Sequence, residues 1–107
     1  MQLLTKELRR SLPPLRAAES PHVIAMAQAK FFTPDSSWTW YASEFDGEDI
    51  FYGLVDGHDL EFGYFSLREL HGVRGHLGLP IERDRFFTPV PLLGLYDELH
   101  RERFRDY

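Results

Sequence analysis

Residues 38–65 read WTWYASEFDGEDIFYGLVDGHDLEFGYF, three runs rich in aromatic and apolar side chains that two Asp-Gly pairs separate. Trp, Tyr, Phe, Val and Ile favour β-strands. Asp-Gly between such runs is a strong hairpin signal, because a primed turn needs positive φ angles that Asp and Gly tolerate. The pattern therefore predicts a β-meander with strands over 38–45, 50–55 and 60–65.

A helix and a strand are expected before the meander. The helix, over about 4–11, is predicted because Thr5 can cap it, leucines recur at helical spacing and two prolines end it. Residues 23–30 are compatible with either a helix or a strand, since Ser20-Pro21 would suit a helix start whereas small and larger side chains alternate with a period of two. Because the run ends in two phenylalanines before a Thr-Pro breaker, we expect a strand over about 25–32.

Three elements are expected after the meander. Ser66 and Glu69 have the spacing of a capping box, which predicts a short helix that ends near 71–73. Alternating side chains over 81–87 predict a last strand at an edge of the sheet. A terminal helix over about 92–104 follows, with its leucines on one apolar stripe.

These elements predict an α+β fold, an antiparallel four- to five-stranded sheet with a central β-meander packed by N- and C-terminal helices. A length of 107 residues suits one globular domain over 1–107. The absence of Cys excludes disulfides and Cys-based zinc sites. No segment approaches the roughly 20 apolar residues of a membrane span, so we expect a cytoplasmic protein without membrane contact.

Acidic and aromatic residues concentrate in the same stretch of the chain. Residues 31–67 contain eight Asp and Glu, no Lys or Arg, and eleven of the sixteen aromatic side chains. Phosphate binding relies on Lys and Arg, so duplex DNA is not an expected partner of a face built from this stretch. The expected partner is a protein that is basic or itself binds nucleic acid, although acids also serve to keep a sheet rich in aromatic rings soluble.

The candidate binding face combines the rings and carboxylates of the meander. In extended strands Trp38 and Trp40 share one face, and Tyr41 lies on the other face with Phe45. Trp and Tyr are favoured interface anchors, because they bury a large area and keep a polar group. The candidate binding residues are Trp38, Trp40, Tyr41, Asp46, Glu48, Asp49, Tyr52, Asp56 and Glu61. The phenylalanines expected in the core are Phe31, Phe51 and Phe62.

Motifs along nearly the whole chain carry a family resemblance. They are Leu4–Glu7, Leu12–Leu15, Phe31–Asp35, Trp38–Tyr41, Glu44–Asp49, Gly63–Ser66, Arg74-Gly75 and Gly78–Asp84. These motifs are similar to those of an uncharacterised bacterial "domain of unknown function" family, made of small proteins often carried on plasmids and other mobile elements. The resemblance implies a mobile-element setting and no mechanism.

The leading hypothesis is a non-enzymatic accessory or regulatory protein that binds a partner protein through the acidic–aromatic sheet face. An acidic inhibitor that imitates DNA is a more specific version of it. One alternative is a single-stranded nucleic-acid-binding protein that stacks bases on Trp38 and Trp40 beside Arg83 and Arg85. Another is a small enzyme that uses His58 with nearby carboxylates. No cofactor or metal is expected from the motifs, and the oligomeric state is left open.

Overall fold

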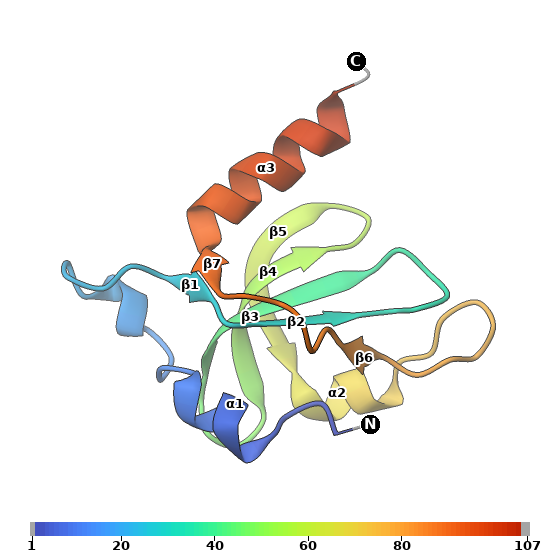
Figure 1. The fold of residues 1–107 in the computed structure, drawn as a ribbon, viewed down its shortest axis with the longest axis horizontal. Coiled ribbons are helices and arrows are strands. Elements are labelled where there is room, and N and C mark those ends of the chain that lie inside the picture. Colours follow the sequence, from blue (N-terminus) through green and yellow to red (C-terminus); the bar gives the residue numbers. More distant parts are fainter. Residues whose placement is uncertain (1, 106–107) are drawn as a thin grey trace.

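An antiparallel five-stranded sheet lies at the centre of the fold in a computed structural model, which describes residues 2–105 (Figure 1). The strands run in the order β5-β4-β3-β2-β6. Their bounds are Ala29–Phe32 for β2, Thr39–Phe45 for β3, Ile50–Asp56 for β4, Leu60–Ser66 for β5 and Glu82–Arg83 for β6. The predicted β-meander is therefore confirmed as β3, β4 and β5, and so is the α+β class.

Helical segments lie near both ends of the described chain and directly after the meander. They are α1 over Lys6–Ser11, the 3-10 turn η1 over Ala17–Glu19, α2 over Leu67–Gly72 and α3 over Leu92–Phe104. The Thr5 hydroxyl accepts the Leu8 N–H at 3.1 Å, and the Ser66 hydroxyl accepts the Glu69 N–H at 3.2 Å, so both predicted N-caps are confirmed. Within residues 2–105 no helix has the length and apolar character to cross a membrane.

The predicted strand over 25–32 divides into two strands at Gln28. The first part is β1, Met26–Ala27, which pairs with β7, Val90–Pro91, in a separate two-stranded sheet. The second part is β2, which pairs with β3 and β6. In one continuous strand Ala27 and Ala29 would lie on the same face. They are instead buried in different cores, so the alternation seen in the sequence does not describe a single strand.

Both predicted Asp-Gly hairpins form, but neither Asp-Gly pair adopts the two positive φ angles of a primed turn. Gly47 has a φ of 90°, whereas Asp46 and Asp56 do not adopt positive φ angles. The carboxylate of Asp46 instead accepts N–H groups over a four-residue loop, residues 46–49. The second loop spans residues 57–59, where the Gly57 N–H donates to the carbonyl of Asp59 at 3.0 Å.

A β-bulge in β3 moves Phe45 to the face opposite the predicted one. The pairing of β3 with β4 advances by one residue between Ala42, opposite Gly53, and Glu44, opposite Tyr52. The extra residue inverts the alternation beyond it. Phe45 therefore lies in the same core as Trp40, whereas Tyr41 lies in the other core.

The predicted last strand over 81–87 is shorter than expected and lies at the edge of the sheet, as predicted. β6 has two residues, because a turn follows it at once. The carboxylate of Asp84 accepts the Phe86 N–H at 2.9 Å, and the carbonyl of Asp84 accepts the Phe87 N–H at 3.3 Å. This turn directs the chain away from β2 and toward β7.

The two faces of the sheet pack against different parts of the chain. One core lies under the N-terminal segment and α2, and its members include Leu3, Leu12, Phe31, Trp40, Phe45, Phe51, Phe65 and Leu70. The other lies under α3, where the predicted apolar stripe contributes Leu92, Leu95, Tyr96 and Leu99 beside Tyr41 and Leu54. Phe31 and Phe51 are buried as predicted, but Phe62 remains 37% exposed because it lies on the outermost strand.

Candidate functional site

Two acids of the first hairpin loop serve as acceptors for backbone N–H groups. One carboxylate oxygen of Asp46 accepts the N–H groups of Glu48, Asp49 and Ile50 at 2.8 to 3.0 Å. Asp49 reaches the start of α2, where it accepts the Ser66 hydroxyl at 2.6 Å and the Arg68 N–H at 2.8 Å. These bonds to the charged form lower the pKa of Asp46, through the N–H groups of Asp49 and Glu48, and that of Asp49, through the Ser66 hydroxyl and the Arg68 N–H.

Two further acids bind backbone N–H groups of loops that are distant in the sequence. Glu44 is buried, and its two carboxylate oxygens accept the N–H groups of Arg16 and Ala18, each at 2.9 Å. Asp35 accepts the N–H groups of Leu77 and Leu79 at 2.6 and 3.2 Å. Desolvation raises the pKa of Asp35, but these N–H donors outweigh it and hold the pKa below its usual value.

Asp56 joins the end of β4 to α3. Its carboxylate pairs with the guanidinium of Arg103 at 2.8 Å, and both side chains are about three-quarters buried, with 27% and 28% exposed. The same guanidinium donates to the carbonyls of Gly57 and His58. Five of the eight acids in residues 31–67 therefore have a structural role in the fold.

The remaining acids in residues 31–67 are Glu48, Asp59 and Glu61. All are exposed, and their side chains make no hydrogen bond or ion pair with the described part of the chain. Glu48 lies in the first hairpin loop, whereas Asp59 and Glu61 lie at the other end of the sheet. Among the acids of residues 31–67, those without a partner in the described chain therefore lie at two places, one at each end of the sheet.

Asp59 and Glu61 meet in a pocket at the outer edge of β5, which we name the β5 pocket. It has a volume of about 300 Å³ and is lined by Trp38, Val55, His58, Asp59, Glu61, Phe62, Gly63 and Tyr64. Apart from Gly63 itself and its two chain neighbours, no described residue has an atom within 4 Å of where a Cβ on Gly63 would be, so the missing side chain leaves the pocket open. Carboxylates thus border a surface made of aromatic and aliphatic groups.

Trp38 forms a wall between the β5 pocket and a second pocket. Its indole packs so closely on Gly57 that a Cβ there would lie 2.3 Å from the ring. It also contacts the His58 imidazole edge-on, with ring centroids 5.2 Å apart. The position of the turn backbone and that of the indole therefore depend on each other.

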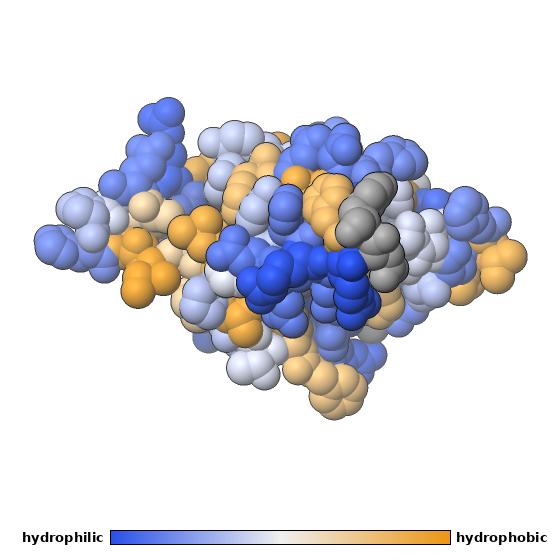
Figure 2. Space-filling model, turned by 90° about the horizontal axis from the view of Figure 1, so that it is seen from above, coloured by the Kyte–Doolittle hydropathy of each residue, from blue (hydrophilic) through white to orange (hydrophobic). Residues whose placement is uncertain are grey.

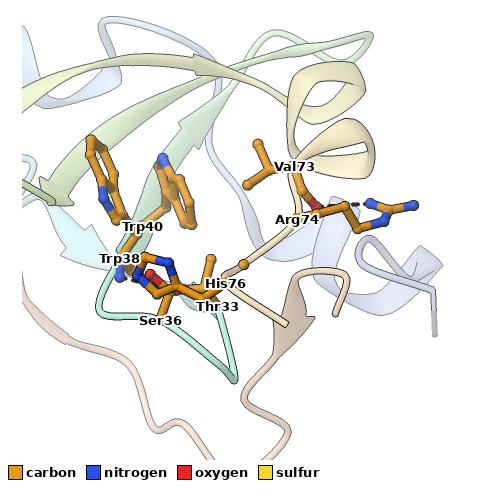
Figure 3. Close-up of a pocket in the computed structure, with 8 residues that line it drawn as sticks. Thr33, Ser36, Trp38, Trp40, Val73, Arg74 and His76 are labelled. Carbon is orange, nitrogen blue, oxygen red and sulfur yellow. Dashed lines mark hydrogen bonds between the residues drawn. The ribbon is translucent and has the colours of Figure 1, made fainter. Parts of the chain in front are cut away.

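The second pocket, which we name the tryptophan pocket, has a volume of about 360 Å³ (Figure 3). Its lining residues are Thr33, Ser36, Trp38, Trp40, Val73, Arg74, Gly75 and His76. The two indoles lie near each other, with centroids 5.8 Å apart and planes at 30°. Arg74 points its guanidinium away from the tryptophans and donates to the carbonyls of His71 and Val73 (Figure 3).

The predicted binding residues do not form one continuous face. Trp40 and Tyr41 are buried on opposite sides of the sheet, where burial raises the pKa of Tyr41 to about 12. Tyr52 is half-buried in an edge-on contact with Tyr64, and burial raises its pKa as well. The first hairpin loop and the second are separated by the length of β4, roughly 20 Å at 3.3 Å per residue.

The structure brings together the residues of the enzyme hypothesis but not those of the nucleic-acid hypothesis. His58 lines the β5 pocket with Asp59 and Glu61. Arg83 and Arg85 line a different pocket from the two tryptophans, and the Arg83 guanidinium donates to the carbonyls of Gln2 and Leu3. Among residues 2–105 no three His, Asp or Glu side chains lie close enough together to hold a metal ion.

Sequence reasoning considered Asp59 only as a carboxylate beside His58, and it missed Phe62, Gly63 and Tyr64 as members of a site. Gly63 interrupts an otherwise bulky strand, and a glycine in that position is typical of a place where another chain or ligand comes close. Phe62 and Tyr64 point to the same face as Leu60, but only the outermost position of β5 leaves them exposed.

Comparison with known proteins gives a family and no activity. No curated protein and no solved structure matches the chain. The sequence profile of the proteins of unknown function DUF2958 matches residues 3–104, which includes all four helical elements and every strand. The chain therefore belongs to the DUF2958 family of proteins of unknown function.

Proposed function

We propose that this protein is a non-enzymatic accessory or regulatory factor that binds a basic partner protein through the β5 pocket. The observation that carries the proposal is the presence of two unengaged acids, Asp59 and Glu61, beside Trp38 in one pocket, which residues 62–64 of β5 also line. Arg103 is a basic side chain beside this loop, and it is already bound to Asp56 and two carbonyls. The two carboxylates are thus available to a cation from outside.

A Lys or Arg side chain has the chemistry that this pocket would accept. Its aliphatic stem would pack on Val55 and on the Trp38 ring, which also attracts a cation over its face. Its charged group would reach the carboxylates of Asp59 and Glu61. Such a contact is screened by salt, so binding should weaken as ionic strength rises.

The distribution of apolar side chains favours a localised contact. On the side drawn in Figure 2, apolar side chains lie in separate places between hydrophilic ones rather than in one broad patch. A DNA-mimicking inhibitor would need many free carboxylates spaced like phosphates, whereas most acids of residues 31–67 already have partners within the fold. Recognition of a short basic segment is therefore the form of the proposal that we favour.

The proposed setting is the cytoplasm of a bacterium that carries a mobile element. This part rests on the resemblance of the sequence to small proteins of plasmids and other mobile elements. A basic partner in that setting would be a protein that handles nucleic acid, because such proteins carry clusters of Lys and Arg.

The test is affinity capture from a lysate of the native host with three immobilised proteins. These are the wild type, the double variant Asp59→Asn/Glu61→Gln, and the matched control Glu48→Gln, which removes an equally exposed charge at the other end of the sheet. We expect the wild type and the control to capture the same Lys- and Arg-rich protein, and the double variant and high salt to lose it. Equal capture by the double variant would contradict the proposal.

If no basic protein is captured, the nucleic-acid alternative is the next to examine. Single-stranded oligonucleotides should then quench the fluorescence of Trp38 and Trp40 at low salt, because stacked bases would lie against the indoles. Absence of quenching would remove that alternative.

A further inference from the structure

The outer side of β5 presents backbone groups that have no partner within the described chain. Two backbone hydrogen bonds flank the pairing of β4 with β5: the Gly57 N–H donates to the Asp59 carbonyl, and the Leu67 N–H donates to the Asp49 carbonyl. Together with the register, they show that Glu61, Gly63 and Phe65 are the residues of β5 whose N–H and C=O groups face β4. In an antiparallel pair these residues alternate with residues whose N–H and C=O groups point outward. The outward residues of β5 are therefore Leu60, Phe62 and Tyr64.

The two edges of the sheet differ in how they are protected. β6 has two residues, which include a charged Arg83, and a turn follows it. β5 has seven residues and pairs with β4 without a register shift, and its only charged residue is Glu61. Proteins usually guard a long edge strand with charges, bulges or proline, because an open edge pairs readily with another strand. The exposed edge of β5, next to the β5 pocket, is therefore a surface to which another chain can add a strand.

We propose that the partner adds an extended basic segment to β5 as a sixth, antiparallel strand. This inference rests on the proposed function and specifies how the partner binds. Side chains of the added strand would alternate between two faces. Those on the face of Glu61 and Gly63 enter the β5 pocket, and those on the other face contact Phe62 and Tyr64. Lys or Arg at every second position would therefore meet the carboxylates of Asp59 and Glu61.

Charge complementarity selects this occupant over a second copy of the chain. Pairing of two β5 strands would bring the Asp59 and Glu61 carboxylates of both copies to one sheet and supply no cation from residues 31–67. A basic segment places opposite charges at the same positions. Self-association is thus an outcome that the experiment must be able to reveal.

The probe is a fluorescent nine-residue peptide of alternating Lys and Thr. In the proposed arrangement the Lys side chains occupy the pocket face, so the Thr N–H groups point toward β5 and the Lys N–H groups point away from it. A peptide N-methylated at its Thr residues should therefore bind about tenfold more weakly, or not at all, while one N-methylated at its Lys residues should bind as the parent does. An alternating Glu-Thr peptide should not bind.

A matched pair of protein variants tests the same geometry from the other side. The Phe62 N–H points outward, so Phe62→Pro leaves the β4–β5 pairing intact and places the proline ring where the added strand would lie. Phe62→Ala removes the same side chain and keeps the N–H. We expect Phe62→Pro to bind the Lys-Thr peptide about tenfold more weakly than Phe62→Ala, with both variants unfolding cooperatively.

The outcomes separate the two proposals. If Thr and Lys N-methylation have equal effects while Asp59→Asn/Glu61→Gln still weakens binding, strand addition is wrong and the basic-partner proposal stands. If the Lys-Thr peptide does not bind the wild type at low salt, both are wrong. A wild-type dimer in analytical ultracentrifugation that Phe62→Pro dissociates, without peptide binding, would assign the edge to a second copy and overturn the inference.

Discussion

Carboxylates in the middle of this chain act mainly as acceptors for the chain's own N–H groups. Asp46 and Asp49 organise a hairpin loop and a helix start, and Asp35 and Glu44 hold loops that are distant in sequence. Each of these acceptors has its donors within the chain itself and does not require a partner protein. The fold therefore accounts for most of the acids in residues 31–67.

The hydrogen bonds to Asp46 and Asp49 predict a loss of stability in acid. The pKa of both groups is lowered from an ordinary value of 3.8, so their contribution is present above that value and is lost as pH falls through the lower folded-state pKa. The free energy of unfolding should therefore decrease below about pH 4. In Asp49→Asn the decrease should be shallower, as measured by denaturant midpoints between about pH 2 and 7. Identical pH profiles for the variant and the wild type would contradict this.

The contact of Trp38 with Gly57 predicts a large effect of one methyl group. A Cβ on residue 57 would lie 2.3 Å from the indole, so Gly57→Ala must displace the ring or the turn. We expect a loss of about 1–3 kcal/mol in the free energy of unfolding, together with a change in tryptophan fluorescence. Gly94→Ala is the control, since it has open space on α3 and should stabilise the protein by about 0.5–1 kcal/mol. Equal behaviour of the two variants would refute the close contact.

Local side-chain roles could be predicted from the sequence, and distant ones could not. The caps made by Thr5 and Ser66 act over three residues, so their spacing is visible in the chain. Glu44 acts on residues 26 and 28 positions away, which no local pattern reveals. Its burial between the sheet and η1 depends on the path of the chain in three dimensions.

Strand identity and the neighbouring order of the meander strands were predictable in this protein, whereas the register of β3 and the outer position of β5 were not. Alternation and turn residues predict β3, β4 and β5, but the bulge that moves Phe45 to the Trp40 face leaves no mark in the alternation. The outer position of β5 follows from the pairing of β6 with β2, on the opposite side of the sheet. The β5 pocket could not be predicted because it depends on the register of the strands and on the outer position of β5.

The attachment of η1 to the sheet depends on Glu44. The buried carboxylate accepts two N–H groups of this segment, so Glu44→Ala leaves them without their acceptor. We predict a loss of about 1–3 kcal/mol in stability and faster hydrogen exchange of the Arg16 and Ala18 amides.

Glu48→Ala is the matched control for Glu44→Ala. Its side chain is exposed and makes no hydrogen bond with the described residues, so stability should change by less than about 0.5 kcal/mol. Unchanged exchange at Arg16 and Ala18 in Glu44→Ala would contradict the proposed role of Glu44.

In the molecule as a whole, one edge of the sheet ends in a short strand, and the other ends in a long strand that can accept a further strand. Packing by the N-terminal segment, α2 and α3 covers both faces of the sheet, and the short β6 closes one edge. The other edge carries β5, the pocket with Asp59 and Glu61, and the exposed ring of Tyr64. Charge, apolar surface and open backbone groups therefore coincide at β5, and we expect a partner to bind there.

Hydrogen exchange measured residue by residue along β5, with and without the Lys-Thr peptide, is the most direct test of this arrangement. In the free protein the amides of Glu61, Gly63 and Phe65 should exchange slowly, since they bond to β4, and those of Phe62 and Tyr64 should exchange fast. Saturating peptide should slow Phe62 and Tyr64 and leave the other three unchanged. Bound peptide with Phe62 and Tyr64 still exchanging fast would show that β5 does not receive a strand.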